Sequence, residues 1–247
     1  EKLNGMFAIA LYDFKLNKLL LARDRFGKKP LYWGLFDGTL IFGSKLKVFL
    51  KHPAFKKEIN LESLNKYLAY EYVPTPNSIF KWVSKLEPAS YLSFCGGEVK
   101  KKTFWNMTFD TKNFSLGEAL NGLGEKLEDS VKRRLVSDVP LGVFLSGGLD
   151  SSVIAYYAQK NSQTKIKTFS IGFEEESFDE SDHAELVSDF LGTDHHSKIL
   201  SPQDLLEIIP NMGEVIDEPF ADASIIPTLF LSKFTKDYVS VALGGDG

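Results

Sequence analysis

Cysteine, histidine and methionine are scarce in this sequence of 247 residues, which contains one, four and three of them respectively. The single cysteine, Cys95, excludes an internal disulfide and is typical of a reducing, cytoplasmic compartment. No apolar run reaches the roughly 18 residues of a membrane-spanning helix. The net charge of −4 argues against a nucleic-acid-binding surface. We therefore expect neither a membrane nor a nucleic acid as a partner.

The few thiol and imidazole groups do not form a reactive site in the sequence. Cys95 lies in "SFCGGEVK", where no neighbouring base or cation would activate a thiol. His195 and His196 are adjacent, and successive side chains of a strand point to opposite faces of a sheet. We therefore expect no catalytic cysteine and interpret both histidines as ordinary strand residues.

The first half of the chain has the pattern of antiparallel strands. Residues 4–44 contain short segments rich in aromatic and aliphatic residues, separated by turn signals such as Asp37-Gly38. Residues 44–52 and 61–72 have helical spacing, and residues 89–105 return to a pair of strands. This half therefore predicts an α+β fold with neighbouring antiparallel strands.

From Ser115 onwards helical and strand patterns alternate, which predicts a parallel sheet with helices on both faces. The expected helices are 115–135, 151–160, 180–191, one opened by Ser201-Pro202, and one near 224–235; the expected strands are 140–145, 165–172, 194–200 and 237–243. A polar stretch without periodicity separates the two halves. We predict a first domain at residues 1–105, a linker at 106–115, and a second domain at 116–247 that is truncated at its C-terminus.

The string "LGVFLSGGLDSS", residues 141–152, is the most specific feature of the second half. An apolar strand runs into Gly147 and Gly148, which allow a tight turn and a close approach to a ligand. The N–H groups at the start of the following helix are free to bind phosphate oxygens, and three serines add hydroxyl donors. The bland alternative is an ordinary strand–turn–helix with serine and aspartate as N-cap residues.

An acid in this loop, Asp150, would repel a bound phosphate. The kinase-type loop G-x-x-x-x-G-K-[ST] places a lysine near the phosphates, but no lysine is present here. Mg²⁺ prefers a carboxylate together with phosphate oxygens, so a metal ion between Asp150 and the phosphates removes the conflict. The loop therefore predicts a site for magnesium and a polyphosphate.

Two other strand ends carry related signals. "VALGGDG" runs an apolar strand into Gly244, Gly245 and the acid Asp246. "TFSIGF" offers Ile171 as an apolar wall for a base. Because ligands collect at the carboxyl ends of parallel strands, we expect these residues to surround one ligand.

These strings resemble the glutamine-hydrolysing asparagine synthetase family, in which a class II glutamine amidotransferase domain precedes an N-type ATP pyrophosphatase domain. "GMFAIALYD", "LARDRFGKKPLYWG" and "FGSKLKVFL" are similar to the second part of the glutaminase domain. "LGVFLSGGLDSS", "TFSIGFEEESFDESDHAELVSDFLGTDHH", "DEPFADASIIPTLFLSK" and "VALGGDG" are similar to successive blocks of the synthetase domain. The chain is thus expected to be a fragment of such a protein.

The resemblance implies a fold and an activity for each half. The first domain would be part of an N-terminal-nucleophile hydrolase sandwich that releases ammonia from glutamine. The second would be an α/β parallel-sheet ATP pyrophosphatase domain that uses ATP and Mg²⁺ to activate the side-chain carboxylate of aspartate as an acyl-adenylate, which ammonia converts to asparagine. Small-molecule substrates are the expected partners, and a homodimer is the oligomeric state considered.

The resemblance also assigns roles to individual residues. The residues that would contact ATP or pyrophosphate are Phe144, Leu145, Ser146, Gly147, Gly148, Asp150, Ser151, Ser152, Ile171, Gly244 and Gly245. Asp150 would also bind Mg²⁺, Asp246 would be the acid needed to form the adenylate, and Asp24 would bind the amino group of glutamine.

The sequence departs from the family pattern in several places. The family's nucleophile is a cysteine at the mature N-terminus, and a chain that begins at Glu1 has no residue for that role. We therefore expect no glutamine hydrolysis by this chain itself. Lys45 and Gly244 also replace residues that are frequent in the family. The acceptor is either aspartate or another carboxylic acid, such as a sugar acid or a β-lactam precursor; a non-catalytic nucleotide-binding fragment is the third alternative.

Two acidic segments remain open to interpretation. Ser177 and Glu180 have the spacing of a capping box at the start of a helix. Residues 217–224, "DEPFADAS", contain three acids, which either position a substrate or form a solvent-exposed turn.

Overall fold

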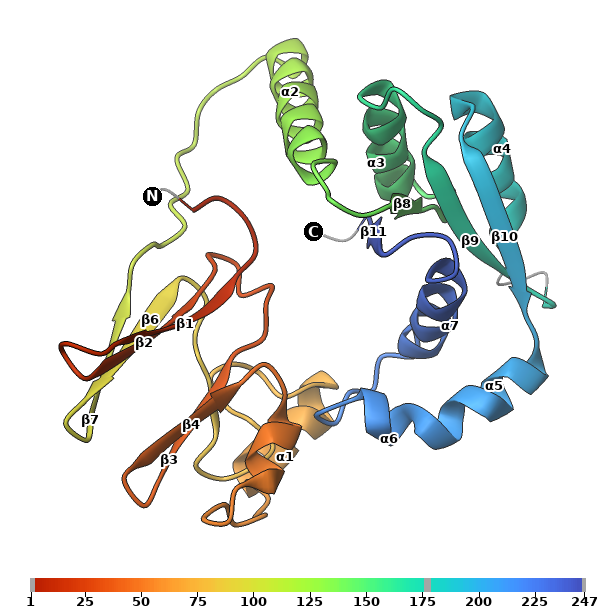
Figure 1. The fold of residues 1–247 in the computed structure, drawn as a ribbon. Helices are drawn as coiled ribbons and strands as arrows, with labels where there is room; N and C mark the ends of the chain where they lie inside the picture. Colours follow the sequence, from red (N-terminus) through yellow and green to blue (C-terminus); the bar gives the residue numbers. More distant parts are fainter. Residues whose placement is uncertain (1–2, 176–178, 246–247) are drawn as a thin grey trace. The chain divides into compact units, whose positions relative to one another are not determined.

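The computed structural model describes residues 3–175 and 179–245 and divides into two compact units (Figure 1). Unit 1 contains the described part of Glu1–Asp110 together with Gly213–Asp222, and unit 2 contains Thr111–Met212 together with the described part of Ala223–Gly247. The chain therefore passes from one unit to the other three times. Residues 104–115, between the last strand of the first half and the next helix, form neither helix nor strand.

Unit 1 is built on two antiparallel sheets, as the sequence predicted for this half. One sheet has the order β1-β2-β6-β7, with β1 at Ala8–Asp13, β2 at Lys18–Arg23, β6 at Ser90–Cys95 and β7 at Glu98–Thr103. The other has the order β4-β3-β5, with β3 at Tyr32–Phe36, β4 at Thr39–Gly43 and β5 at Ser84–Lys85. Helix α1 is Leu61–Tyr70 and the 3-10 helix η1 is Leu46–Lys51.

Apolar residues from both sheets share one cluster. Leu21 of β2 and Leu92 of β6 are fully buried, and Trp33 of β3 packs against the same cluster. Each buried leucine stabilises the fold by about 1.5–3 kcal/mol relative to an exposed one. In η1, Leu46 and Phe49 are buried against the second sheet. The helical spacing of residues 44–52 thus produces 3-10 turns, in a segment whose N-cap residue, Lys45, makes no capping hydrogen bond.

Residues 213–222 belong to unit 1 although the sequence assigned them to the second domain. The Leu46 N–H donates to Asp217 Oδ2 at 3.1 Å, and the Ile79 N–H donates to Glu218 Oε1 at 2.9 Å. Lys85 Nζ lies 2.5 Å from Glu218 Oε2, with side chains only 14% and 11% exposed. The alternative of a solvent-exposed turn is therefore wrong for Asp217 and Glu218, which are anchored in unit 1.

Unit 2 is a mixed α/β unit with a four-stranded parallel sheet, as predicted from the alternating pattern. Its order is β10-β9-β8-β11, with β8 at Leu141–Phe144, β9 at Lys167–Phe173, β10 at Asp194–Leu200 and β11 at Val241–Leu243. The helices are α2 (Leu116–Arg134), α3 (Leu149–Lys160), α4 (Ser181–Leu191), α5 (Pro202–Ile208) and α7 (Ile225–Thr235). The short helix α6, Met212–Val215, and the 3-10 helix η3, Ile209–Asn211, lie between α5 and α7.

Helices cover both faces of this sheet (Figure 1). On one face, Val143 of β8 packs in a buried cluster with Ala155 of α3 and Ala184 of α4. On the other, the ring of Phe169 in β9 contacts Phe234 of α7, with ring centroids 6.0 Å apart. The carboxyl ends of the strands therefore lie at one edge of the sheet, between the helices that follow the strands on its two faces. No helix in the described ranges is both long and apolar enough to cross a membrane.

Candidate active site

The loop after β8 has a left-handed backbone conformation, which favours glycine, at one position. The Leu145 N–H donates to the Phe169 carbonyl at 2.8 Å, which ties the end of β8 to β9. Gly147 follows with a φ of +78°, and a Cβ there would lie 2.5 Å from Cβ of His183 at the start of α4. Gly147 therefore allows both the turn and the close packing of the loop against α4.

Serine hydroxyls hold the loop in this shape. Ser146 N–H donates to Ser151 Oγ at 3.2 Å, and the two serine hydroxyls are 3.0 Å apart. The hydroxyls of Ser151 and Ser152 both donate to the Gly148 carbonyl, at 3.2 Å and 2.7 Å. These bonds fix the N-terminal turn of α3, whose first N–H groups have no acceptor within the helix.

The end of β11 lies beside this loop because β8 and β11 are neighbours in the sheet. Val241 pairs with Leu141 and Leu243 with Val143. A Cβ on Gly245 would lie 2.8 Å from the Ser151 backbone nitrogen, so the chain after β11 contacts the first turn of α3 directly. The predicted acid Asp246 lies outside the described residues.

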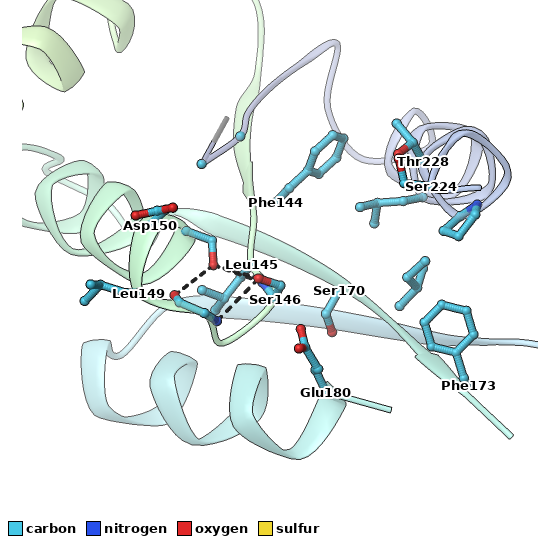
Figure 2. Close-up of a pocket in the computed structure, with 17 residues that line it drawn as sticks. Phe144, Leu145, Ser146, Leu149, Asp150, Ser170, Phe173, Glu180, Ser224 and Thr228 are labelled. Carbon is cyan, nitrogen blue, oxygen red and sulfur yellow. Dashed lines mark hydrogen bonds between the residues drawn. The ribbon is translucent and has the colours of Figure 1, made fainter. Parts of the chain in front are cut away.

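A cavity of about 730 Å³ opens at these strand ends. Of the residues predicted to contact ATP, nine line it: Phe144, Leu145, Ser146, Gly148, Asp150, Ser151, Ile171, Gly244 and Gly245. Gly147 and Ser152 support the loop without lining the cavity. Figure 2 shows Asp150 and Ser146 towards one end of the cavity and Phe173 at the other, with Thr228 of α7 and Ser224, the residue before α7, along one wall.

Sequence reasoning missed several polar residues of this cavity. Ser170, Glu180, Ser224 and Thr228 all line it. Glu180 was missed because the sequence predicted it to form a capping box with Ser177. Ser177 lies outside the described residues. In the structure α4 begins at Ser181, and Glu180 makes no side-chain capping bond. The available signal was the position of Glu180 in an acidic run. The start of the helix decides where the Glu180 side chain points, and the spacing alone does not determine that start.

The charge of the cavity suits a magnesium ion. Its described lining contains two carboxylates, Asp150 and Glu180, and no lysine or arginine. Asp150 is exposed, and no cation among the described residues forms an ion pair with it. The described part of the chain has no group of three or more His, Cys, Asp or Glu side chains that could hold a metal by itself. This donor set fits Mg²⁺, which binds through one or two carboxylates and takes its other ligands from phosphates and water.

Asp24, the predicted glutamine ligand, is hydrogen-bonded to the backbone of unit 1. Its carboxylate is 2% exposed and accepts from the N–H groups of Phe7, Phe26, Lys28 and Lys29 at 3.0–3.2 Å. Burial alone would raise the pKa of Asp24, but these four donors together bring the pKa below its ordinary value. Since a carboxylate has about four lone-pair sites, this geometry favours a structural role over binding an amino group.

Comparisons with known proteins match both halves of the chain. The family model described as asparagine synthase matches residues 122–247, more than half of the chain, and the glutamine amidotransferase domain model matches residues 1–105. The asparagine synthase match begins within α2 and contains every strand of the parallel sheet.

Several curated relatives are similar over most or all of this chain. Asparagine synthetase [glutamine-hydrolyzing] 1 of Bacillus subtilis is 36% identical over 248 residues, which cover 100% of this chain and 39% of the relative. Putative asparagine synthetase [glutamine-hydrolyzing] 2 of Methanocaldococcus jannaschii is 38% identical over 253 residues, 100% of this chain and 49% of the relative. The amidase chyE of Penicillium rubens is 31% identical over 213 residues, 78% of this chain and 31% of the relative.

The chain spans less than half the length of these three relatives. The family itself rests on the asparagine synthase match, which covers the loop, the cavity and the parallel sheet described above. By that match, this chain belongs to the asparagine synthase family.

Proposed function

We propose that the complete protein is an ATP-dependent ligase that converts aspartate to asparagine through an acyl-adenylate, with ammonia from glutamine. The observation that carries this proposal is the cavity at the strand ends, which is lined by a glycine loop and by the first turn of α3 with its carboxylate Asp150, without any lysine or arginine in the described lining. The asparagine synthase match supports the same activity.

Each residue predicted for the ATP site has a role in this proposal. The backbone of Ser146 and Gly148 and the first turn of α3 bind the pyrophosphate group, with Gly147, Ser151 and Ser152 holding the loop. Phe144, Leu145 and Ile171 contact the adenosine, and Gly244 and Gly245 allow the chain after β11 to approach the nucleotide. Asp150 holds Mg²⁺, and Asp246 is the acid that serves formation of the adenylate.

The chemistry explains why such a site is needed. A carboxylate oxygen of aspartate attacks the α-phosphorus of ATP, and pyrophosphate leaves. Ammonia then attacks the carbonyl carbon of the mixed anhydride, AMP leaves with its oxygen, and the new amide nitrogen releases a proton. When bound, Mg²⁺ neutralises charge that develops on the pyrophosphate. The helix N-terminus adds partial positive charge to the same group.

The first half supplies the ammonia in this proposal. Residues 1–105 form part of an N-terminal-nucleophile hydrolase sandwich, residues 106–115 are the linker, and residues 116–247 are the ATP pyrophosphatase part. The two antiparallel sheets of unit 1 and the glutamine amidotransferase match support this division, with residues 213–222 of the second part packed in unit 1. The expected partners are ATP, glutamine and the acceptor acid.

Exchange of labelled pyrophosphate into ATP tests the proposal in the complete protein. We expect exchange that depends on aspartate and magnesium and that falls about 100-fold in Asp150→Ala, because charge stabilisation by the metal is worth several kcal/mol. Asp138→Ala is the matched control, since Asp138 is exposed and does not line the cavity. Absence of any exchange in the parent would leave only a nucleotide-binding role.

A second candidate keeps the adenylation and changes the acceptor to another carboxylic acid. One relative that covers 78% of this chain has a name other than asparagine synthetase, amidase chyE, and this is the observation behind the second candidate. Exchange stimulated by a sugar acid or a β-lactam precursor, and not by aspartate, would decide for this candidate.

A further inference from the structure

His195 lies between two hydroxyl groups of the neighbouring strand. Its Nδ1 is 2.9 Å from Thr168 Oγ1, and its Nε2 is 3.1 Å from Ser170 Oγ. The register of β10 and β9 causes this arrangement, since His195 pairs with Thr168 and lies two residues before the partner of Ser170. Ser170 in turn lines the cavity assigned above to the nucleotide.

The two residues that bear these hydroxyl groups are shielded from water. Thr168 is 0% and Ser170 is 3% exposed. Burial lowers the pKa of His195, and the neighbouring His196 lowers it further, whereas Glu185 and Asp189 of α4 act in the opposite direction. The imidazole is therefore neutral at neutral pH, so that one ring nitrogen donates a hydrogen bond and the other accepts one.

One order of donors and acceptors through the network begins at a backbone carbonyl at its far end. The Thr193 hydroxyl donates to the Ser188 carbonyl, which can only accept, at 3.5 Å. In that order Thr193 Oγ1, 2.9 Å from Thr168 Oγ1, accepts from the Thr168 hydroxyl. Thr168 has then used its proton, so it accepts from Nδ1–H of His195. Nε2 is left as the acceptor for the hydroxyl proton of Ser170.

We propose that His195 is a positioning residue that holds the Ser170 hydroxyl with its lone pairs towards the nucleotide, so that Ser170 accepts a hydrogen bond from the nucleoside. This rests on the proposed function, in which the cavity binds ATP and Ile171, the next residue of β9, contacts the adenosine. Two nucleoside groups can donate such a bond: the amino group of the base and the ribose hydroxyls. Figure 2 shows Ser170 on β9 between Ser146 and Phe173, away from Asp150.

A double-mutant cycle in the complete protein tests whether His195 acts through Ser170, with the affinity for ATP and magnesium as the readout. Ser170→Ala and His195→Phe are each expected to weaken ATP binding about tenfold, the loss of one hydrogen bond in a buried site. Because both remove the same bond, the double variant is expected to bind no more weakly than Ser170→Ala alone. Losses that multiply to about 100-fold, or unchanged affinity in His195→Phe, would overturn the proposal.

Two further variants separate positioning from packing. His195→Gln keeps one donor and one acceptor and is expected to stay within about threefold of the parent. His196→Phe is the matched control, because His196 stacks on Phe169 on the other face of the sheet and takes no part in the network. If His195→Phe does not fold, Ser170→Ala and His195→Gln carry the test: the proposal requires a loss in the first and none in the second, and any other pair of results overturns it.

Nucleotide analogues identify the donor. Ser170→Ala should cost nothing for inosine triphosphate if Ser170 accepts from the base amino group, and nothing for 2′,3′-dideoxy-ATP if it accepts from the ribose. An equal loss for ATP and both analogues would overturn the proposal. A parent protein that binds no ATP would instead refute the proposed function.

Discussion

At the scale of single residues, burial and partners decide which role a side chain has. The resemblance predicted that Asp24 binds glutamine, but the carboxylate faces four backbone N–H groups. Arg23 beside it donates to the carbonyls of Gly27, Lys29 and Leu86. The two charged side chains thus hold the turn that follows β2, and such interactions between distant backbone groups leave no pattern in the sequence.

Replacement of Asp24 is expected to destabilise unit 1 in a pH-dependent manner. Asp24→Asn directs an amide NH₂ at backbone donors and should lower the free energy of unfolding by about 3 kcal/mol at pH 7. The folded-state pKa of Asp24 lies below its ordinary value. Its contribution is therefore fully present above the unfolded-state pKa of about 3.9 and is lost as the pH falls through the folded-state pKa. The difference between parent and variant should accordingly shrink at acidic pH.

Urea unfolding followed by tryptophan fluorescence measures this effect, because Trp33, Trp82 and Trp105 all lie in unit 1. Asp110→Asn is the control, since Asp110 is an exposed residue of the same unit. Equal unfolding midpoints for Asp24→Asn and the control at pH 7 would contradict the structural role.

The glycine loop was predictable and the polar wall opposite it was not. Gly147 and Gly148 predict a tight turn by their residue type. Asp150 indicates a metal ion, because it is an acid at a position that suits phosphate. Ser170 gives no such signal, because its contact with His195 depends on the register of β9 and β10. Sequence reasoning correctly placed His195 on a strand.

At the scale of elements, local signals located most helices and strands. Helices α2 and α5 begin after Ser115 and Ser201, each of which forms a capping box with the acid three residues later. Strand β11 is shorter than expected, with ladder pairing only over Val241–Leu243. Its partner β8 is itself only four residues long, so the length of the pairing is set by a neighbour and not by the strand's own sequence.

The anchored segment at residues 213–222 makes a testable contribution to unit 1. Glu218→Gln leaves the Lys85 ammonium group buried without its counter-ion and should lower the free energy of unfolding by about 3 kcal/mol. Burial first, and then Glu218 and Asp217, raise the pKa of Tyr32, in agreement with a carboxylate held in this interior. Tryptophan fluorescence during urea unfolding again reports on the unit.

An exposed ion pair supplies the comparison for this variant. Glu98 and Lys100 are 3.3 Å apart with side chains 74% and 77% exposed. Glu98→Gln should change the free energy of unfolding by less than about 0.5 kcal/mol. If Glu218→Gln had an effect as small as Glu98→Gln, the segment would not be anchored as the structure describes.

At the scale of the whole molecule, the sequence divides into two halves and the structure into two units, but their membership differs. The change from antiparallel to alternating patterns near residues 106–115 was visible in the sequence. The return of residues 213–222 to unit 1 was not, because it depends on Glu218 meeting Lys85 more than 100 residues earlier. Hydrophobic periodicity reports the faces of single elements and carries no information on such pairs.

The central claim is that the loop at residues 146–152 holds the magnesium-bound triphosphate of ATP. Crystals of the complete protein grown with ATP and Mn²⁺ in place of Mg²⁺ test it most directly. We expect anomalous density for the metal about 2 Å from a carboxylate oxygen of Asp150, with the phosphates at the first turn of α3. Metal and triphosphate bound elsewhere, or bound in Asp150→Ala as in the parent, would contradict the claim.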